Sequence, residues 1–190
     1  MNAQRLTSAD FRVEPWANGK GETLLLARAP DSAAWDWRLS SVELDHDSDY
    51  SDFSGFARTQ LLVRGNGLKL KHAEVELDLK HVGAKISFPG HQRFHAGLID
   101  GPVRVINGFA RNGVVDIELM LRPLSGRMLL TPRPNSEWFG LLLCGGLQVI
   151  EGQESFEIEP GDGFRITDVP APWAKLEGHG DLVLARIQTH

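Results

Sequence analysis

The stretch "LLVRGNGLKL" (Leu61–Leu70) joins two apolar runs through a glycine turn, and "LLLCGGLQVI" (Leu141–Ile150) repeats the pattern 80 residues later. Each stretch is followed by a further strand, a glycine turn and another strand, in residues 77–88 and 156–167. Apolar runs joined by glycine are typical of β-hairpins. The repeat therefore predicts two similar β-rich halves in one chain.

The rest of the chain shows the same short period of apolar positions. Phe156 and Ile158, for example, alternate with glutamates, which is the spacing of half-buried strands. Twenty glycines and ten prolines separate runs of this kind. Helical spacing is found only near the N-terminus, where one short turn with Thr7 or Ser8 as its cap is expected.

A hairpin followed by a strand, a turn and another strand is an order of elements that is typical of a cupin barrel. We therefore predict an all-β bicupin fold, with two stacked cupin-like β-barrels of the jelly-roll type. Residues 1–122 are expected to form the N-terminal barrel and residues 123–190 the C-terminal barrel, which strands from the N-terminal part complete. The two barrels are expected to form one compact unit.

The composition indicates an ordinary globular protein and argues against several partners. The 190 residues carry a formal net charge of −5 without a block of Lys and Arg, so nucleic-acid binding is not expected. No apolar run approaches the roughly 18 residues of a membrane span, and the first residues lack the apolar core of a signal peptide. The only cysteine, Cys144, lies in an apolar run and is expected in the core. These features predict a cytoplasmic protein without an intramolecular disulfide.

Motifs that would indicate cofactor or metal chemistry are incomplete. "PWANGKGET" (Pro15–Thr23) lacks the spacing of a phosphate-binding loop and is followed by a strand rather than a helix. "DHDSDY" (Asp45–Tyr50) lacks the Gly and Glu that a calcium loop needs. The H-x-H pair of metal-binding cupins and the G-x-S-x-G nucleophile motif are also absent. We therefore expect no metal and no cofactor.

Arginines beside aromatic residues are the most suggestive polar feature. Arg38 follows two tryptophans in "WDWRLSS", Arg58 ends "FSGFAR", and Asn107 lies between two arginines in "PVRVINGFARNG". By strand alternation, Arg38 shares a side with Ser40, opposite Trp37. If that side faces a barrel interior, the guanidinium needs an anionic partner, either an internal Asp or Glu or a bound carboxylate. Surface positions for these arginines are the alternative.

Three ordered segments resemble motifs of the HutD/Ves family. "PWANGKGET", "WDWRLSSVEL" and "YSDFSGFARTQLLVRGNGLKL" look like its W-x-N-G-x-G-x-T, W-R-[LA]-S and F-S-x-F-P-G-x-x-R motifs, and the resemblance extends to about residue 125. It implies a cupin-type fold with two barrel halves and an accessory or regulatory role beside the proteins of histidine degradation, without an established catalytic activity. Tyr50, Ser54, Val105 and Phe109 replace the Phe, Pro, Asp and Met that are usual in the family. If that Asp contributes to a ligand site, the pocket chemistry differs here.

The residues expected to bind a ligand are Trp16, Asn18, Trp37, Arg38, Ser40, Phe56, Arg58 and Asn107. The two arginines would hold a carboxylate, the Asn and Ser side chains would supply hydrogen bonds, and a tryptophan would cover the apolar part. A purely structural role for Trp16, closing the barrel end, is an equal alternative.

The leading hypothesis is a metal-independent accessory or regulatory protein of histidine degradation that binds a small anionic metabolite. Urocanate, formiminoglutamate and formylglutamate are the candidate ligands, on the resemblance, and another histidine-utilisation protein is a candidate partner. A homodimer is also plausible. The first alternative is a metal-free cupin enzyme, an isomerase or hydrolase, with His95 or Glu43 as general base. The second is an interaction module without a pocket.

Overall fold

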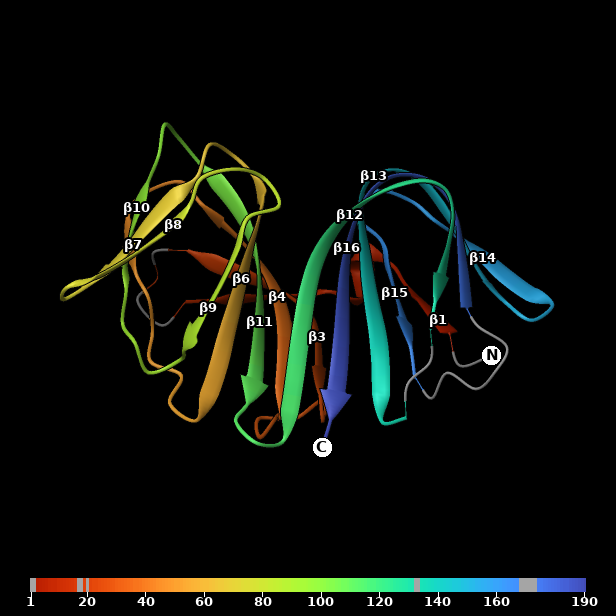
Figure 1. Ribbon diagram of the computed structural model, residues 1–190, viewed down its shortest axis with the longest axis horizontal. Coiled ribbons are helices and arrows are strands. Elements are labelled where there is room, and N and C mark those ends of the chain that lie inside the picture. The colour runs from red at the N-terminus through yellow and green to blue at the C-terminus, as the bar shows by residue number, and fades with distance from the viewer. Residues whose placement is uncertain (1–2, 17–18, 20, 132–133, 168–173) are drawn as a thin grey trace. The chain divides into compact units, whose positions relative to one another are not determined.

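The computed structural model describes residues 3–16, 19, 21–131, 134–167 and 174–190, and these form β-strands with one short helical turn (Figure 1). In chain order the elements are β1 (Ala3–Leu6), η1 (Ser8–Asp10), β2 (Arg12–Pro15), β3 (Glu22–Ala29), β4 (Trp37–Leu44), β5 (Ser48–Asp49), β6 (Phe56–Arg64), β7 (Leu68–His72), β8 (Val75–Leu79), β9 (Lys85–Pro89), β10 (His95–Leu98), β11 (Val103–Arg111), β12 (Val115–Leu130), β13 (Ser136–Glu151), β14 (Glu154–Ile158), β15 (Gly163–Ile166) and β16 (Ala174–Thr189).

The chain is all-β, as predicted, and the expected N-terminal turn is present as η1. Thr7 is the N-cap of η1, and its backbone N–H and hydroxyl both donate to the carboxylate of Asp10, at 2.7 and 2.8 Å. Within the described ranges, no helix has the length and apolar composition that crossing a membrane requires.

The chain divides into two units, which are described here one at a time. The N-terminal unit is Arg12–Asp116, and the C-terminal unit combines residues 1–11 with residues 117–190. Both contain antiparallel sheets, because every pair of neighbouring strands with an assigned register runs in opposite directions.

Two sheets form the N-terminal unit. One has the strand order β2-β3-β4-β11-β6-β9 and the other β5-β10-β7-β8. In the first sheet, Asn107 of β11 lies opposite Ser40 of β4 on one side and Gln60 of β6 on the other. Because residues in register point to the same face of a sheet, these three polar side chains are brought together.

The C-terminal unit has one sheet of order β1-β15-β13-β16-β12, with β14 paired to β13. Its buried cluster is apolar and contains Ala3, Leu130, Trp138, Leu142, Leu147, Val149, Ile158, Phe164, Ile166, Ala174, Leu176, Leu182 and Leu184. The strand β1, from the start of the chain, joins this sheet by pairing with β15.

The two repeated stretches do not form hairpins, contrary to the prediction. At the first, the chain leaves the sheet of β6 and enters the sheet of β7, so the glycines make a corner rather than a hairpin turn. Gly65 there has a positive φ of 101°, and a Cβ at this position would lie 2.5 Å from the carbonyl oxygen of Pro102. The second stretch lies within one continuous strand, β13.

Cys144 is exposed, so its predicted place in the core is wrong. The pairing of β13 with β16 shifts register between Leu142 and Cys144. An extra residue in a strand interrupts the alternation of its side chains, so position 144 no longer follows the apolar pattern of its neighbours.

Candidate functional site

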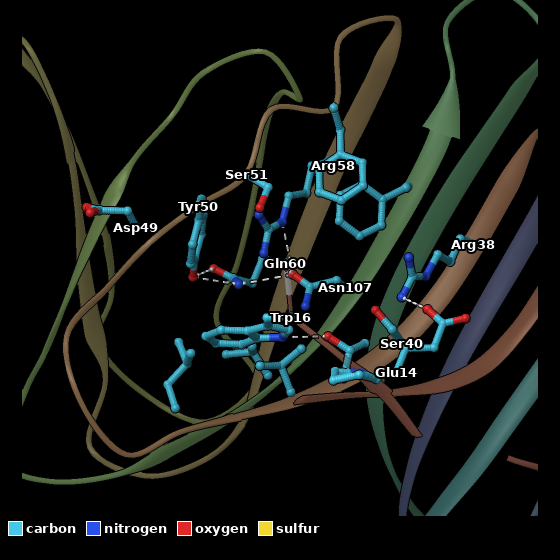
Figure 2. A pocket seen from close by; sticks show the side chains of 17 residues that line it. Glu14, Trp16, Arg38, Ser40, Asp49, Tyr50, Ser51, Arg58, Gln60 and Asn107 are labelled. Atoms are coloured by element: carbon cyan, nitrogen blue, oxygen red, sulfur yellow. Dashed lines mark hydrogen bonds and ion pairs between the residues drawn. The ribbon is translucent and has the colours of Figure 1, made fainter. Parts of the chain in front are cut away.

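A pocket with a volume of about 310 Å³ lies in the N-terminal unit (Figure 2). It is lined by β2, β3, β4, β6 and β11 and by the segment from residue 49 to residue 53. Apolar lining includes Val42, Leu44 and Val105, and polar lining comes from side chains on β2, β3, β4, β6 and β11 and from the segment from residue 49 to residue 51. The volume is at the lower end of the range of about 300–1,000 Å³ that is usual for small-molecule sites.

Arg58 of β6 is buried against the pocket, with 7% of its surface exposed. Its Nε and Nη2 both donate to Asn107 Oδ1, at 3.1 and 2.9 Å. The guanidinium carbon lies 4.0 Å from the centroid of the Tyr50 ring and 5.1 Å from that of Phe109, within the range of cation–π attraction. Burial lowers the pKa of Arg58, although an arginine stays charged at neutral pH. No Asp or Glu in the described ranges forms an ion pair with it.

Behind Arg58, a chain of buried hydrogen bonds fixes the orientation of Asn107. Gln60 Nε2 donates to Asn107 Oδ1 at 3.0 Å and to the Tyr50 hydroxyl at 2.9 Å. Because arginine can only donate, the Asn107 atom that faces Arg58 must be the oxygen. The Asn107 amide nitrogen is then turned away from this network, as Figure 2 shows, and its N–H groups are available to the pocket. Burial raises the pKa of the Tyr50 hydroxyl.

Arg38 of β4 differs from Arg58 because it has a carboxylate partner. Its Nη2 donates to Glu14 Oε2 at 2.7 Å, and its side chain is 14% exposed. Arg38 Nε is buried and has no hydrogen-bond partner in the described part of the chain. Burial lowers the pKa of Arg38, and the carboxylate of Glu14 opposes this shift.

Trp16 both lines the pocket and shapes the loop after β2. Its indole Nε1 donates to Thr23 Oγ1 at 2.9 Å, and its backbone N–H donates to the carbonyl of Gly21. A Cβ at Gly21 would lie 2.9 Å from the indole ring, so the absence of a side chain at this glycine makes room for Trp16. The packing of Trp16 is therefore a structural reason for the glycine at position 21.

Five of the eight residues expected from the sequence line one pocket: Trp16, Arg38, Ser40, Arg58 and Asn107. Trp37 is buried but does not line it, because neighbouring residues on β4 point to opposite faces. Phe56 is also outside the lining, and its ring packs 4.4 Å from that of Trp35. Asn18 lies outside the described residues.

Three important pocket residues were missed in the sequence: Glu14, Tyr50 and Gln60. Strand alternation could have predicted Gln60, because it lies two residues after Arg58 on the same strand and therefore on the same face. No sequence pattern predicts Glu14, since nothing near it in the chain indicates its pairing with Arg38.

The two general bases considered for an enzyme lie outside the pocket lining. Glu43 is exposed and pairs with Arg64. His95 has a side chain that is 55% exposed, and its Nδ1 lies 2.8 Å from Oδ1 of Asp49, which is at the pocket edge. Among the described residues, no three His, Cys, Asp or Glu side chains are grouped so that they could hold a metal ion.

Solved structures show the type of fold. A conserved protein of unknown function from Pseudomonas aeruginosa superposes with a TM-score of 0.85 and 20% identity, covering 98% of this chain and 97% of that protein. HutD from Pseudomonas fluorescens superposes with a TM-score of 0.79 and 19% identity, covering 99% of both chains. A cupin 2 conserved barrel domain protein from Leptotrichia buccalis superposes with a TM-score of 0.55 and 11% identity over 88% of each chain. The fold is therefore cupin-like.

Sequence comparison gives the family. An uncharacterised 21.2 kDa protein in the hutC 3′ region of Pseudomonas putida is 27% identical over 107 residues, which are 55% of this chain and 56% of that protein. The chain thus matches little more than half of that relative's length. The profile of the HutD family matches residues 8–184, which is nearly the whole chain. The chain therefore belongs to the HutD family.

Proposed function

We propose that the N-terminal pocket binds a small metabolite through a carboxylate placed at Arg58, and that the protein serves histidine degradation as an accessory or regulatory component. The observation that carries the proposal is the buried guanidinium of Arg58, which faces the pocket without a carboxylate partner among the described residues. A buried charge without a counterion is costly, so such a site favours an anionic ligand that restores neutrality.

Hydrogen-bond donors around Arg58 suit a carboxylate. Two of the guanidinium nitrogens already donate to Asn107, which leaves Arg58 Nη1 and the second N–H of Nη2 for a ligand. The Asn107 amide nitrogen and the Ser40 hydroxyl line the same pocket. Together these groups offer charge-assisted hydrogen bonds to both oxygens of one carboxylate. The donors are all side chains, so the proposal needs no metal ion.

The family supports histidine degradation as the source of the ligand. The relative from Pseudomonas putida is named for its position beside hutC, and one of the similar structures is HutD. Urocanate carries one carboxylate, whereas formiminoglutamate and formylglutamate carry two each, and these three are the compounds that we propose to test. Each of the two units would be one cupin-like barrel, with the ligand in the N-terminal one. Another protein of the same pathway would then interact with the ligand-bound form of this protein.

Thermal unfolding with and without each compound tests the proposal. A ligand at 100 times its dissociation constant should stabilise the protein by about 2.7 kcal/mol. The stabilisation should be lost in Arg58→Met, which keeps an unbranched side chain of similar length but removes the charge. The proposal would be contradicted if none of the three compounds stabilised the wild-type protein. It would also be contradicted if a compound stabilised Arg58→Met as much as the wild-type protein.

A further inference from the structure

The pocket contains a carboxylate of its own, which is already placed on one of the two guanidinium groups. Glu14 Oε2 accepts from Arg38 Nη2 at 2.7 Å, and Glu14 Oε1 lies 3.7 Å from Arg28 Nη1. Arg58 forms no ion pair with the described residues. Without ligand, the protein therefore neutralises the Arg38 side of the pocket and leaves the Arg58 side positive.

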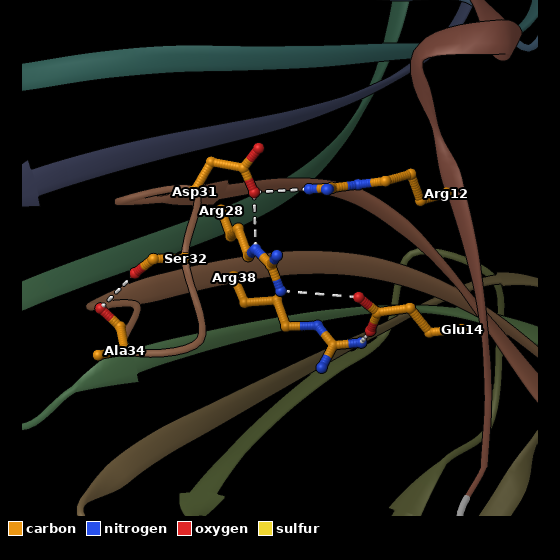
Figure 3. A network of polar contacts seen from close by, with 7 residues as sticks. All are labelled: Arg12, Glu14, Arg28, Asp31, Ser32, Ala34 and Arg38. Atoms are coloured by element: carbon orange, nitrogen blue, oxygen red, sulfur yellow. Dashed lines mark hydrogen bonds and ion pairs between the residues drawn. The ribbon is translucent and has the colours of Figure 1, made fainter.

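Glu14 is also held in this place by residues that do not line the pocket (Figure 3). Arg28 Nε donates to Asp31 Oδ1 at 2.8 Å, and Arg12 Nη2 donates to the same oxygen at 2.6 Å. Asp31 thus keeps Arg28 beside Glu14, and Arg28 and Arg38 attract the carboxylate together. A ligand group that reaches Arg38 must approach this fixed negative charge.

We propose that Glu14 is a specificity-determining residue, which makes the pocket prefer ligands with one carboxylate over ligands with two. This inference rests on the proposed function, in which the first carboxylate binds Arg58, and of the three compounds named there it favours urocanate, which has a single carboxylate. A second carboxylate at the other end of a ligand would lie beside Glu14 or displace it from Arg38, and both arrangements place like charges together in a partly buried site. A neutral amide at the same end would instead donate its N–H groups to Glu14.

Replacing Glu14 should reverse this preference. In Glu14→Gln, Arg38 would line the pocket without the carboxylate that separates its charge from that of Arg28 behind it. Two close guanidinium groups attract an anion, so the second carboxylate of a ligand would gain a binding position. The substitution keeps the size of the side chain. It lies in β2, which among the described strands is at the edge of its sheet and pairs with β3, so little disturbance of the sheet is expected.

Titration calorimetry with glutarate and its monoamide tests the proposal, because the two compounds have the same length and differ by one charge. The wild-type protein should bind the monoamide about tenfold more tightly, since like charges brought together cost energy. In Glu14→Gln, the ratio of the two affinities should fall by about tenfold or more. The matched control is Glu118→Gln, which removes a carboxylate that accepts from Arg186 at 2.6 Å in the C-terminal unit and should keep the wild-type ratio.

A second variant tests the proposal from the opposite direction. Arg38→Gln removes the cation but keeps Glu14, so the preference for the monoamide should increase. An unchanged ratio in Glu14→Gln, a lower ratio in Arg38→Gln, or tighter binding of glutarate by the wild-type protein would overturn the inference. If binding is lost in Arg58→Met but the ratio of the two affinities does not change in Glu14→Gln, this inference is overturned and the proposed function is not. The absence of binding of both compounds would overturn this inference, whereas the proposed function would fail only if urocanate, formiminoglutamate and formylglutamate also gave no stabilisation.

Discussion

The interiors of the two units differ, although both are lined by antiparallel strands with alternating side chains. Each unit has a buried apolar cluster, and in the described part of the C-terminal unit the buried polar side chains are Ser136 and Asp162. In the N-terminal unit, Ser40, Arg58, Gln60 and Asn107 are in addition all buried around a pocket. The alternation of a strand determines which residues face inward, whereas the identity of those residues determines whether the interior is packed or hollow. The comparison therefore predicts different responses to substitution in the two units.

Truncating a large side chain in the C-terminal unit should give the largest effect. Phe164 is fully buried, and a Cβ at Gly140 would lie 2.2 Å from its ring, so the two positions are in close contact. Phe164→Ala should lower the free energy of unfolding by about 3–5 kcal/mol. Urea unfolding followed by circular dichroism measures this. The control is Leu129→Ala, at a position that is 55% exposed, and it should change stability by less than about 0.5 kcal/mol. A loss below 1 kcal/mol for Phe164→Ala would mean that the C-terminal interior is not close-packed.

Removing the acceptor that holds Arg58 should give the next largest effect. Asn107→Leu leaves a buried guanidinium without its hydrogen-bond acceptor, and we expect a loss of about 2–3 kcal/mol in unfolding free energy. Asn107→Asp is the matched comparison, because it offers Arg58 a carboxylate. That variant should keep the unfolding free energy of the wild-type protein. Its new carboxylate should compete with an anionic ligand for Arg58. Equal stability of Asn107→Leu and the wild-type protein in chemical denaturation would show that Arg58 does not depend on Asn107.

Removing the charge itself should have a small effect of the opposite sign. In Arg58→Met, the cost of burying an uncompensated cation disappears, so the unfolding free energy should stay unchanged or rise by about 1 kcal/mol. Ligand-induced stabilisation should be lost in the same variant. A strongly destabilised Arg58→Met would indicate that Arg58 holds the N-terminal unit together and does not serve a ligand.

The smallest expected effect is a change in stability at alkaline pH. Burial raises the pKa of the Tyr50 hydroxyl above its usual value of about 10, so the phenol ionises first in the unfolded chain. Its contribution to stability is complete below about pH 10 and is lost as the pH rises through the raised folded-state pKa. Between about pH 9 and pH 11, Tyr50→Phe should therefore lose less unfolding free energy than the wild-type protein. Parallel pH profiles of the two proteins would contradict this.

Strand alternation predicted part of the site. It placed Arg38 and Ser40 on one side of β4, opposite Trp37, and the structure confirms that arrangement. Arg58 and Asn107 were singled out by their place near arginines and aromatic residues and again by the family resemblance, and the register of β11 between β4 and β6 explains why they meet. The all-β class also followed from the period of two residues.

Other features depend on contacts that no local pattern encodes. The stretch at Leu61–Leu70 has the composition of a hairpin, but β7 pairs with β8 and β10 instead of β6, and only the competition among strands decides this. The ion pair between Glu14 and Arg38 joins two strands that are both neighbours of β3 rather than of each other. The outward position of Cys144 depends on a register shift of one strand against its partner.

The amide of Asn107 has one consequence for how such proteins diversify. Its two ends have opposite polarity, and the groups behind it decide which end meets the guest. Because Arg58 donates twice to the Asn107 oxygen, a substitution at Gln60 alone leaves the amide nitrogen turned toward the guest. A change at Arg58 would release the amide to rotate, so the loss of one cation could also turn a neighbouring donor into an acceptor.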